Sequence, residues 1–248
     1  MTVRYGIGLG GLWLAALAGC TEPADGTAAT GTPLLRPVDA PTAAESSDPP
    51  AYRLERVGPS GLSVAVPGAE RVLAAAPLRG GTVAFVTHEG FDGTLALSAG
   101  DECRTLDTAV VPELAVSPDG TRLLYPRRAG DDVELVLAEP SRGRREVVGR
   151  GPTADRPVFR PDGEAFAFVG TNAGGLASLF VIDGPGPARQ VTNVGLQGPG
   201  LPAGFVPPPL RAGDLAWDGG RLVYPAPDGR RCEVDLAAAR GTCAEVRP

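Results

Sequence analysis

The one histidine of the chain is the first side chain to consider as a catalyst. His88 stands in the segment VTHEGFDGT, with Glu89 and Asp92 close by in the sequence. An imidazole beside carboxylates can serve as a general base, because its ordinary pKa lies near neutral pH. No other reactive group accompanies this segment, so we interpret His88 as an exposed loop residue that takes no part in catalysis.

The remaining residue types also argue against an enzyme. All 23 basic residues are arginine, which excludes a Schiff-base lysine and a phosphate-binding loop of the P-loop type. No G-x-S-x-G nucleophile elbow is present, and Asp131 and Asp132 lack the spacing of a calcium-binding loop. We therefore expect no catalytic residue, no metal and no cofactor. The net charge of −6, without a basic stripe, also argues against a nucleic-acid partner.

The first twenty residues, MTVRYGIGLGGLWLAALAGC, have the features of a targeting signal. Arg4 is followed by an apolar run from Tyr5 to Gly19, which is short for a membrane span and typical of a signal-peptide core. The run ends in Leu-Ala-Gly-Cys, which resembles the lipobox of bacterial lipoproteins. The resemblance implies that residues 1–19 are removed as a signal peptide and that Cys20 is acylated. The alternative is an ordinary secretory signal followed by an unrelated cysteine.

The residues after the signal indicate how the protein is held in the cell envelope. Acyl chains on Cys20 would anchor it to a membrane, since each buried methylene contributes about 0.8 kcal/mol. In lipoproteins with this motif an Asp at the next position favours the inner membrane, so Thr21 implies the outer membrane, with the protein facing the periplasm. Residues 20–50 are rich in Thr, Pro, Ala and Ser and contain no aromatic residue, which predicts a disordered tether. Residues 51–248 remain for the folded domain.

Two phrases within this domain repeat at a distance of 43 residues. SPDGTRLLY begins at Ser117 and RPDGEAFAF begins at Arg160, and each joins a Pro-Asp-Gly turn to an apolar strand. In the second copy Phe166 and Phe168 face one way and Ala167 faces the other, so both faces of the sheet are expected to be covered. Further along the chain, each copy contains two more segments that match between the copies, and these predict two more strands. A four-stranded sheet of about 40–45 residues that is covered on both faces is a propeller blade.

Weaker copies flank these two phrases and extend the repeat. RGGTVAFV, followed by a strand at 94–97, lies upstream, and AWDGGRLVYP lies downstream. The segments VSPDGTRLLY, FRPDGEAFAF and LFVIDGPGPARQVTN resemble the WD-like repeat of TolB-type propellers, over roughly Val66 to Val246. The resemblance implies an all-β propeller, and the copies of the repeat predict an array of about four four-stranded blades, or five if Tyr52 to Val66 contributes strands. Because members of that family commonly have six or more blades, ring closure is left open.

Three cysteines remain in the domain, and in an oxidising compartment an odd number leaves one unpaired. Cys232 and Cys243 flank an expected terminal hairpin, CEVDLAAARGTC, and we predict a disulfide between them that leaves Cys103 free. The alternative is that Cys103 pairs with one of them because the first and last blades touch. No CxxC pair is present, so the cysteines do not indicate a zinc site.

The sequence favours a lipid-anchored, non-enzymatic propeller module of the cell envelope that binds a protein, peptide or glycan through its loops. The rival interpretations are an enzyme or enzyme accessory with a site at the central channel, and a purely structural envelope lipoprotein. Residues 195–209 are rich in Pro and Gly and surround the apolar pair Phe205 and Val206. An apolar pair on a stiffened loop could bind a partner at low entropic cost. Its alternative role is to cap the exposed face of the terminal blade.

Overall fold

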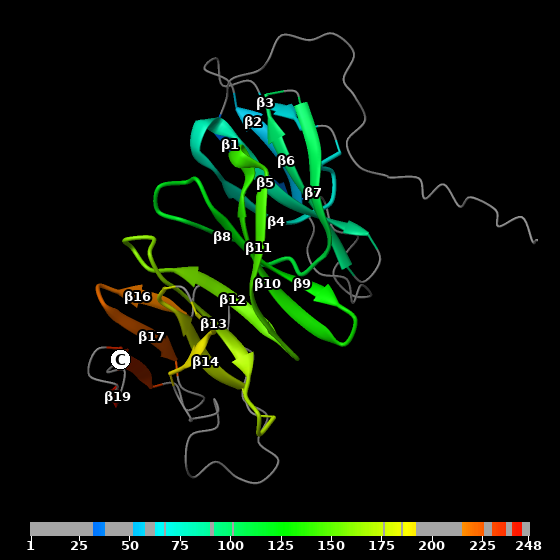
Figure 1. Cartoon of the computed structure of the whole chain (residues 1–248). Coiled ribbons are helices and arrows are strands. Elements are labelled where there is room, and N and C mark those ends of the chain that lie inside the picture. The colour runs from blue at the N-terminus through cyan, green and yellow to red at the C-terminus, as the bar shows by residue number, and fades with distance from the viewer. Residues whose placement is uncertain are drawn as a thin grey trace, which may run out of the picture.

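Short antiparallel strands account for nearly all the regular structure of the chain (Figure 1). Within the described residues of the computed structural model there are 19 strands, two 3-10 turns and no α-helix. The all-β class expected from the repeat is therefore confirmed. The described residues are 32–37, 52–57, 63–66, 68–89, 92–100, 102–175, 177–184, 186–191, 215–225, 230–236 and 240–244.

Four successive groups of strands each form an antiparallel, four-stranded meander, as the repeat predicts, and the single pair Val110–Arg127 joins the first two groups into one sheet. The first blade consists of β4 (Val72–Pro77), β5 (Val83–Glu89), β6 (Asp92–Ala99) and β7 (Glu102–Val110). The second consists of β8 (Ala115–Val116), β9 (Leu123–Ala129), β10 (Asp132–Glu139) and β11 (Arg144–Gly151). The third consists of β12 (Ala154–Phe159), β13 (Phe166–Thr171), β14 (Ala177–Ile182) and β15 (Arg189–Gln190). The fourth consists of β16 (Ala216–Asp218), β17 (Arg221–Pro225), β18 (Arg231–Asp235) and β19 (Arg240–Ala244).

Three N-terminal strands extend the sheet of the first blade instead of forming a separate fifth blade. They are β1 (Thr32–Pro37), β2 (Tyr52–Val57) and β3 (Ser63–Ala65). β1 pairs with β2 along its whole length, and β2 joins β4 through the pair Tyr52–Val72. Part of the segment predicted as a disordered tether, residues 20–50, is thus a strand. Composition does not reveal this strand, because β1 is formed by ladder hydrogen bonds to a neighbour that is distant in the sequence.

The Pro-Asp-Gly turns of the second and third blades have the same geometry. The Gly120 N–H donates to Ser117 O at 2.8 Å, and the Gly163 N–H donates to Arg160 O at 2.8 Å. Both glycines have positive φ, +73° and +76°, the conformation for which glycine is favoured. Strands β9 and β13 then begin three residues after each glycine. The repeated phrase therefore encodes a repeated turn and strand, as predicted.

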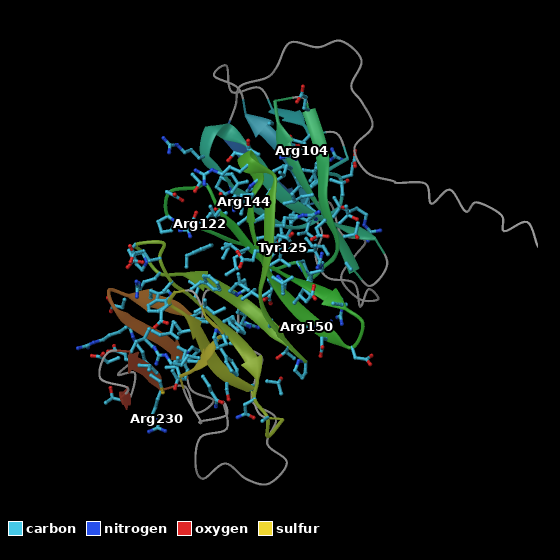
Figure 2. All side chains as sticks on the ribbon, viewed as in Figure 1. Arg104, Arg122, Tyr125, Arg144, Arg150 and Arg230 are labelled. Atoms are coloured by element: carbon cyan, nitrogen blue, oxygen red, sulfur yellow. The ribbon has the colours of Figure 1, made fainter. Side chains whose placement is uncertain are left out.

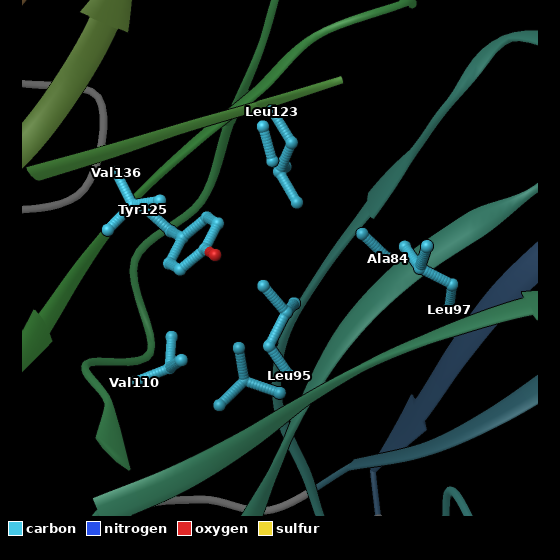
Figure 3. Packing of buried hydrophobic residues seen from close by; sticks show 9 residues of the cluster. Ala84, Leu95, Leu97, Val110, Leu123, Tyr125 and Val136 are labelled. Carbon is cyan, nitrogen blue, oxygen red and sulfur yellow. The ribbon is translucent and has the colours of Figure 1, made fainter. Parts of the chain in front are cut away.

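Hydrophobic cores lie between successive blades. The core between the first and second blades contains Leu95 and Tyr125, both fully buried (Figure 3). On β13, Phe166 and Phe168 join the core toward the second blade, whereas Ala167 joins the core toward the fourth. Successive residues of one strand thus serve two different cores, which confirms the prediction that both faces of the sheet are covered.

The first strands of the blades follow one another along the inner side of the array, where β4 contacts β8, β8 contacts β12 and β12 contacts β16. The first and fourth blades lie toward opposite ends of the molecule (Figure 1). Among the described strands, β16 to β19 form ladders only with one another. The described blades therefore form an open array, without a ladder that closes it into a ring.

Candidate functional site

Loops from two parts of each blade gather at one end of the array. Successive strands of an antiparallel meander run in opposite directions. The turn between the first and second strands therefore lies at the same end as the connection between the third and fourth strands. We call this end the Pro-Asp-Gly face, after the turns at 118–120 and 161–163.

Neighbouring blades are bonded to each other on this face. The Arg79 N–H of the first blade donates to Gly120 O in the turn of the second blade, at 2.8 Å. The Arg122 guanidinium of the second blade donates to Gly163 O in the turn of the third. It also lies 5.5 Å from the centroid of the Phe159 ring. The Pro-Asp-Gly turns thus fix the position of each blade against the preceding one.

The third and fourth blades are joined by an arginine–tryptophan contact. The Arg160 guanidinium lies 6.0 Å from the Trp217 ring centroid, and Trp217 Nε1 donates to Val158 O at 3.3 Å. The Trp217 ring also packs against the core between these blades. Trp217 therefore packs blade against blade.

A cleft of about 830 Å³ opens on the Pro-Asp-Gly face between the first and second blades. The first blade contributes the 3-10 turn η1 (Arg79–Gly81) and the start of β7. The second contributes its Pro-Asp-Gly turn and the 3-10 turn η2 (Pro140–Arg142). Arg104, on β7 (Figure 2), donates from Nη2 to Pro140 O at 2.9 Å and so links the two blades. The volume falls within the range of about 300–1,000 Å³ that is typical of small-ligand sites.

Charged and apolar groups occur together in the lining of this cleft. Arg79 and Arg104 are exposed, and neither has a carboxylate partner among the described residues. Glu102 is the one carboxylate among the described residues of the lining. Leu78 is half-buried and Ala99 is exposed, and both add apolar surface. The cleft can therefore accept a ligand that carries both a negative charge and an apolar group.

A second polar cluster joins the same two blades, and its side chains use their hydrogen-bonding groups on one another. The Tyr125 hydroxyl donates to Asp107 Oδ2 at 2.8 Å. Arg127 and Arg145 pair with the same carboxylate at 3.2 and 3.4 Å. Burial, and then the hydrogen bond to Asp107, raise the pKa of Tyr125. Because the members of this cluster satisfy one another, we assign it a structural role.

A third polar cluster lies at the inner strands, where the second blade meets the third. Glu113 precedes β8, and its carboxylate accepts a hydrogen bond from the Arg156 N–H on β12. Burial raises the pKa of Glu113, and burial likewise raises the pKa of the neighbouring Asp155. Arg156 has a φ of +54°, and its Nη1 is buried without a hydrogen-bond partner in the described part of the chain. Glu113 and Arg156 occupy equivalent positions of successive repeats, 43 residues apart.

The structure places the backbone of most of the groups first considered for chemistry in strands. His88 lies within β5, at the pair His88–Gly93, and not in a loop as the sequence suggested. Asp132 lies in β10 and pairs with Arg150 at 3.2 Å. Among the described residues, no group of three or more His, Cys, Asp or Glu side chains could hold a metal ion.

The cysteines differ in part from the expectation. Cys103 and Cys232 are both disulfide-bonded, so the prediction of a free Cys103 is wrong for this structure. The two side chains belong to different cores, Cys103 beside the N-terminal strands and Cys232 between the third and fourth blades. The β18–β19 register places Cys232 directly opposite Cys243, as the predicted hairpin requires.

Three residues that the sequence singled out, Cys20, Phe205 and Val206, lie outside the described residues. In the part of the chain that is described, no helix has the length and apolar character needed to cross a membrane.

The cleft itself was not predicted from the sequence. Arg79, Arg104 and Pro140 come from three separate turns and strands, and no motif links them. The sequence held one indication of the cleft, which is the position of these residues within the repeat. Each lies at a strand end on the side of the Pro-Asp-Gly turns.

Blades of this kind define a β-propeller protein, and solved structures support that class. The chain is similar to TolB from Acinetobacter baumannii, with a TM-score of 0.51 and 19% identity over 77% of this chain and 48% of that one. It is also similar to the Dos1 propeller, with a TM-score of 0.57 and 14% identity over 86% of this chain and 60% of that one. An oligogalacturonate lyase in complex with manganese gives a TM-score of 0.52 and 18% identity over 72% and 52% of the two chains.

These similarities concern the fold. The chain spans about half the length of the TolB structure that it matches. No protein-family model matches the chain, and no match was found among curated proteins. The TolB-type resemblance of the repeats is thus confirmed as a resemblance of propeller architecture.

Proposed function

We propose that the chain is a non-enzymatic, lipid-anchored propeller module of the bacterial cell envelope that binds a protein, peptide or glycan partner. In this proposal the Cys20 lipid holds it at the outer membrane, facing the periplasm, and the tether carries the blades away from the membrane. The cleft between the first and second blades is the observation that supports the binding role. It is large enough for a ligand, and two guanidinium groups without carboxylate partners in the described residues line it.

The binding role can be tested by site-specific photo-crosslinking in the producing cells. A photo-crosslinking amino acid at Ala99, an exposed residue of the cleft lining, should give a discrete adduct with a partner. The same amino acid at Ala129, at the β9–β10 hairpin and outside the lining, is the matched control. Adducts at both positions or at neither would contradict binding in the cleft. The absence of any adduct would favour a purely structural lipoprotein.

A second candidate function, an enzyme with its site at the inner strands, is favoured by the Glu113 cluster. Two neighbouring carboxyls with raised pKa, Glu113 and Asp155, are the kind of pair that acid–base catalysis uses. Activity of the full chain toward generic peptide and sugar substrates that disappears in Glu113→Gln would support this function. Activity that survives the substitution, or no activity at all, would leave the binding module as the better proposal.

The pair Phe205 and Val206 is a second candidate contact, on sequence grounds alone. Changing both to Ser should abolish partner capture without changing the melting temperature if they form a contact. A large fall in the melting temperature would show instead that they belong to the core.

A further inference from the structure

We propose that the cleft between the first and second blades recognises the C-terminal carboxylate of a peptide, which Arg79 and Arg104 bind. This assignment rests on the proposed binding role of the cleft and specifies the chemistry of its ligand. It follows from the charge of the lining, from its apolar part and from the residue types that the lining lacks.

The two guanidinium groups are available to a ligand. On the same two blades Arg127 pairs with Glu134 at 2.5 Å, whereas Arg79 and Arg104 have no carboxylate partner among the described residues. Arg104 uses one Nη2 hydrogen bond to Pro140 O, which orients its guanidinium and leaves its other N–H groups free to donate to a ligand. A carboxylate can accept paired hydrogen bonds from an arginine, and such charge-assisted bonds are the strong ones.

The remainder of the lining favours a peptide over a sugar. Leu78, which is half-buried, and Ala99, which is exposed, give apolar surface that suits the side chain of the last residue of a peptide. The described lining contains no aromatic ring against which the apolar face of a sugar could pack. Glu102 is one carboxylate against two guanidinium groups, so the described lining keeps a net positive charge.

The position of Arg79 is set by the contact between the blades. A Cβ on Gly120 would lie 2.9 Å from the Arg79 backbone nitrogen, so the two chains are in close contact at the cleft. The bond between them uses only the Arg79 backbone. Replacing the Arg79 side chain therefore leaves the bond between the blades intact.

Two matched peptide mixtures test the assignment on the full chain in detergent. Both consist of fluorescent, N-blocked tetrapeptides, random at three positions and ending in leucine; one has a free carboxylate and the other a carboxamide. We expect the carboxylate mixture to bind at least about tenfold more tightly, because hydrogen bonds to charged groups are the stronger ones. Arg79→Gln and Arg104→Gln should each remove most of that difference. Arg144→Gln, an exposed arginine on β11 outside the lining, should leave it unchanged.

The alternative outcomes are distinguishable. If both mixtures bind equally and Ala99→Trp, which fills the cleft, abolishes binding of both, the cleft binds peptides but the carboxylate assignment is wrong. An equal loss in Arg144→Gln would show non-specific attraction and overturn the assignment. If neither mixture binds, the assignment is also overturned, and crosslinking at residue 99 decides separately whether the cleft binds a partner.

Discussion

At the scale of single residues, the backbone of the Pro-Asp-Gly turns takes part in the contacts that hold one blade against the next. Gly120 has a positive φ, and its carbonyl oxygen accepts a hydrogen bond from the Arg79 N–H. Gly130 has a similar φ, +69°, but a Cβ there would meet no atom within 4 Å. A comparison of the two glycines therefore distinguishes the energetic cost of a positive φ from the cost of crowding between two blades.

Replacing each glycine by alanine should give losses of stability that differ in size. Gly130→Ala should lower the free energy of unfolding by about 1 kcal/mol, the cost of a left-handed alanine. Gly120→Ala should lower it by roughly 2–4 kcal/mol, because its Cβ would also meet the Arg79 backbone nitrogen at 2.9 Å. Urea unfolding of the two variants measures the difference. Equal losses would mean that the blades are not in close contact at Gly120.

Asp119 makes this turn sensitive to acid. Its carboxylate accepts hydrogen bonds from the Ser117 hydroxyl at 2.6 Å and from the Thr121 N–H and hydroxyl at 3.1 and 2.8 Å. The Ser117 bond is the largest cause that lowers the pKa of Asp119 to about 2, from 3.8. A carboxyl with a lowered folded-state pKa stabilises the fold above its unfolded pKa, and this stabilisation is lost as the pH falls through the folded value.

We therefore expect wild type to melt at a higher temperature than Asp119→Asn at pH 6. The difference should shrink between about pH 4 and pH 2, the interval between the unfolded and folded pKa values of Asp119. Thermal melts of both proteins across this range provide the measurement. A difference that stays constant down to pH 2 would show that the ionised carboxylate does not stabilise the turn.

At the scale of elements, the repeated phrases were sufficient to predict the blades but not the contacts between them. The turn and strand of SPDGTRLLY and RPDGEAFAF depend on local residue types, since Pro, Asp and Gly set the turn and alternating apolar residues set the strand. The strand β1 and the cleft depend on pairings between segments far apart in the sequence. Arg104 and Pro140, for example, meet across 36 residues because β7 and η2 lie side by side.

The terminal hairpin gives a prediction at this scale. Cys232 is 1% exposed and stands opposite Cys243 in the β18–β19 ladder. A disulfide that closes this short loop should contribute about 3 kcal/mol, because it restricts the unfolded chain. Non-reduced peptide mapping should show the Cys232–Cys243 link, and Cys243→Ser should lose about that amount of stability in urea. A link from Cys232 to Cys103 would contradict the pairing.

At the scale of the whole molecule, an open array must cover the face of its first blade. The N-terminal strands do so, because Leu54 and Val66 pack with Phe85 and Ala96 of the first blade in one core. Repeat proteins commonly use such atypical terminal segments as caps. β2 and the segment that follows β3 therefore act as a cap, and β1 adds a further strand on the edge of that cap.

The proposed lipid anchor also constrains the disulfides of the whole molecule. A cysteine sulfur that carries a lipid as a thioether cannot form a disulfide, and the chain has four cysteines. Cys103 and Cys232 are both disulfide-bonded in the structure. If Cys232 pairs with Cys243, Cys20 is the one cysteine left in the chain that could bond to Cys103. Lipidation of Cys20 and an intrachain disulfide at Cys103 then exclude each other.

Cys20→Ser tests the lipid anchor of the whole molecule directly. The variant should be released from salt-washed membranes, since in the proposed function the acyl chains on Cys20 provide the anchor. Sedimentation of membranes from cells that produce wild type or the variant measures the release. Continued sedimentation of Cys20→Ser with the membranes would show that another part of the chain holds it there.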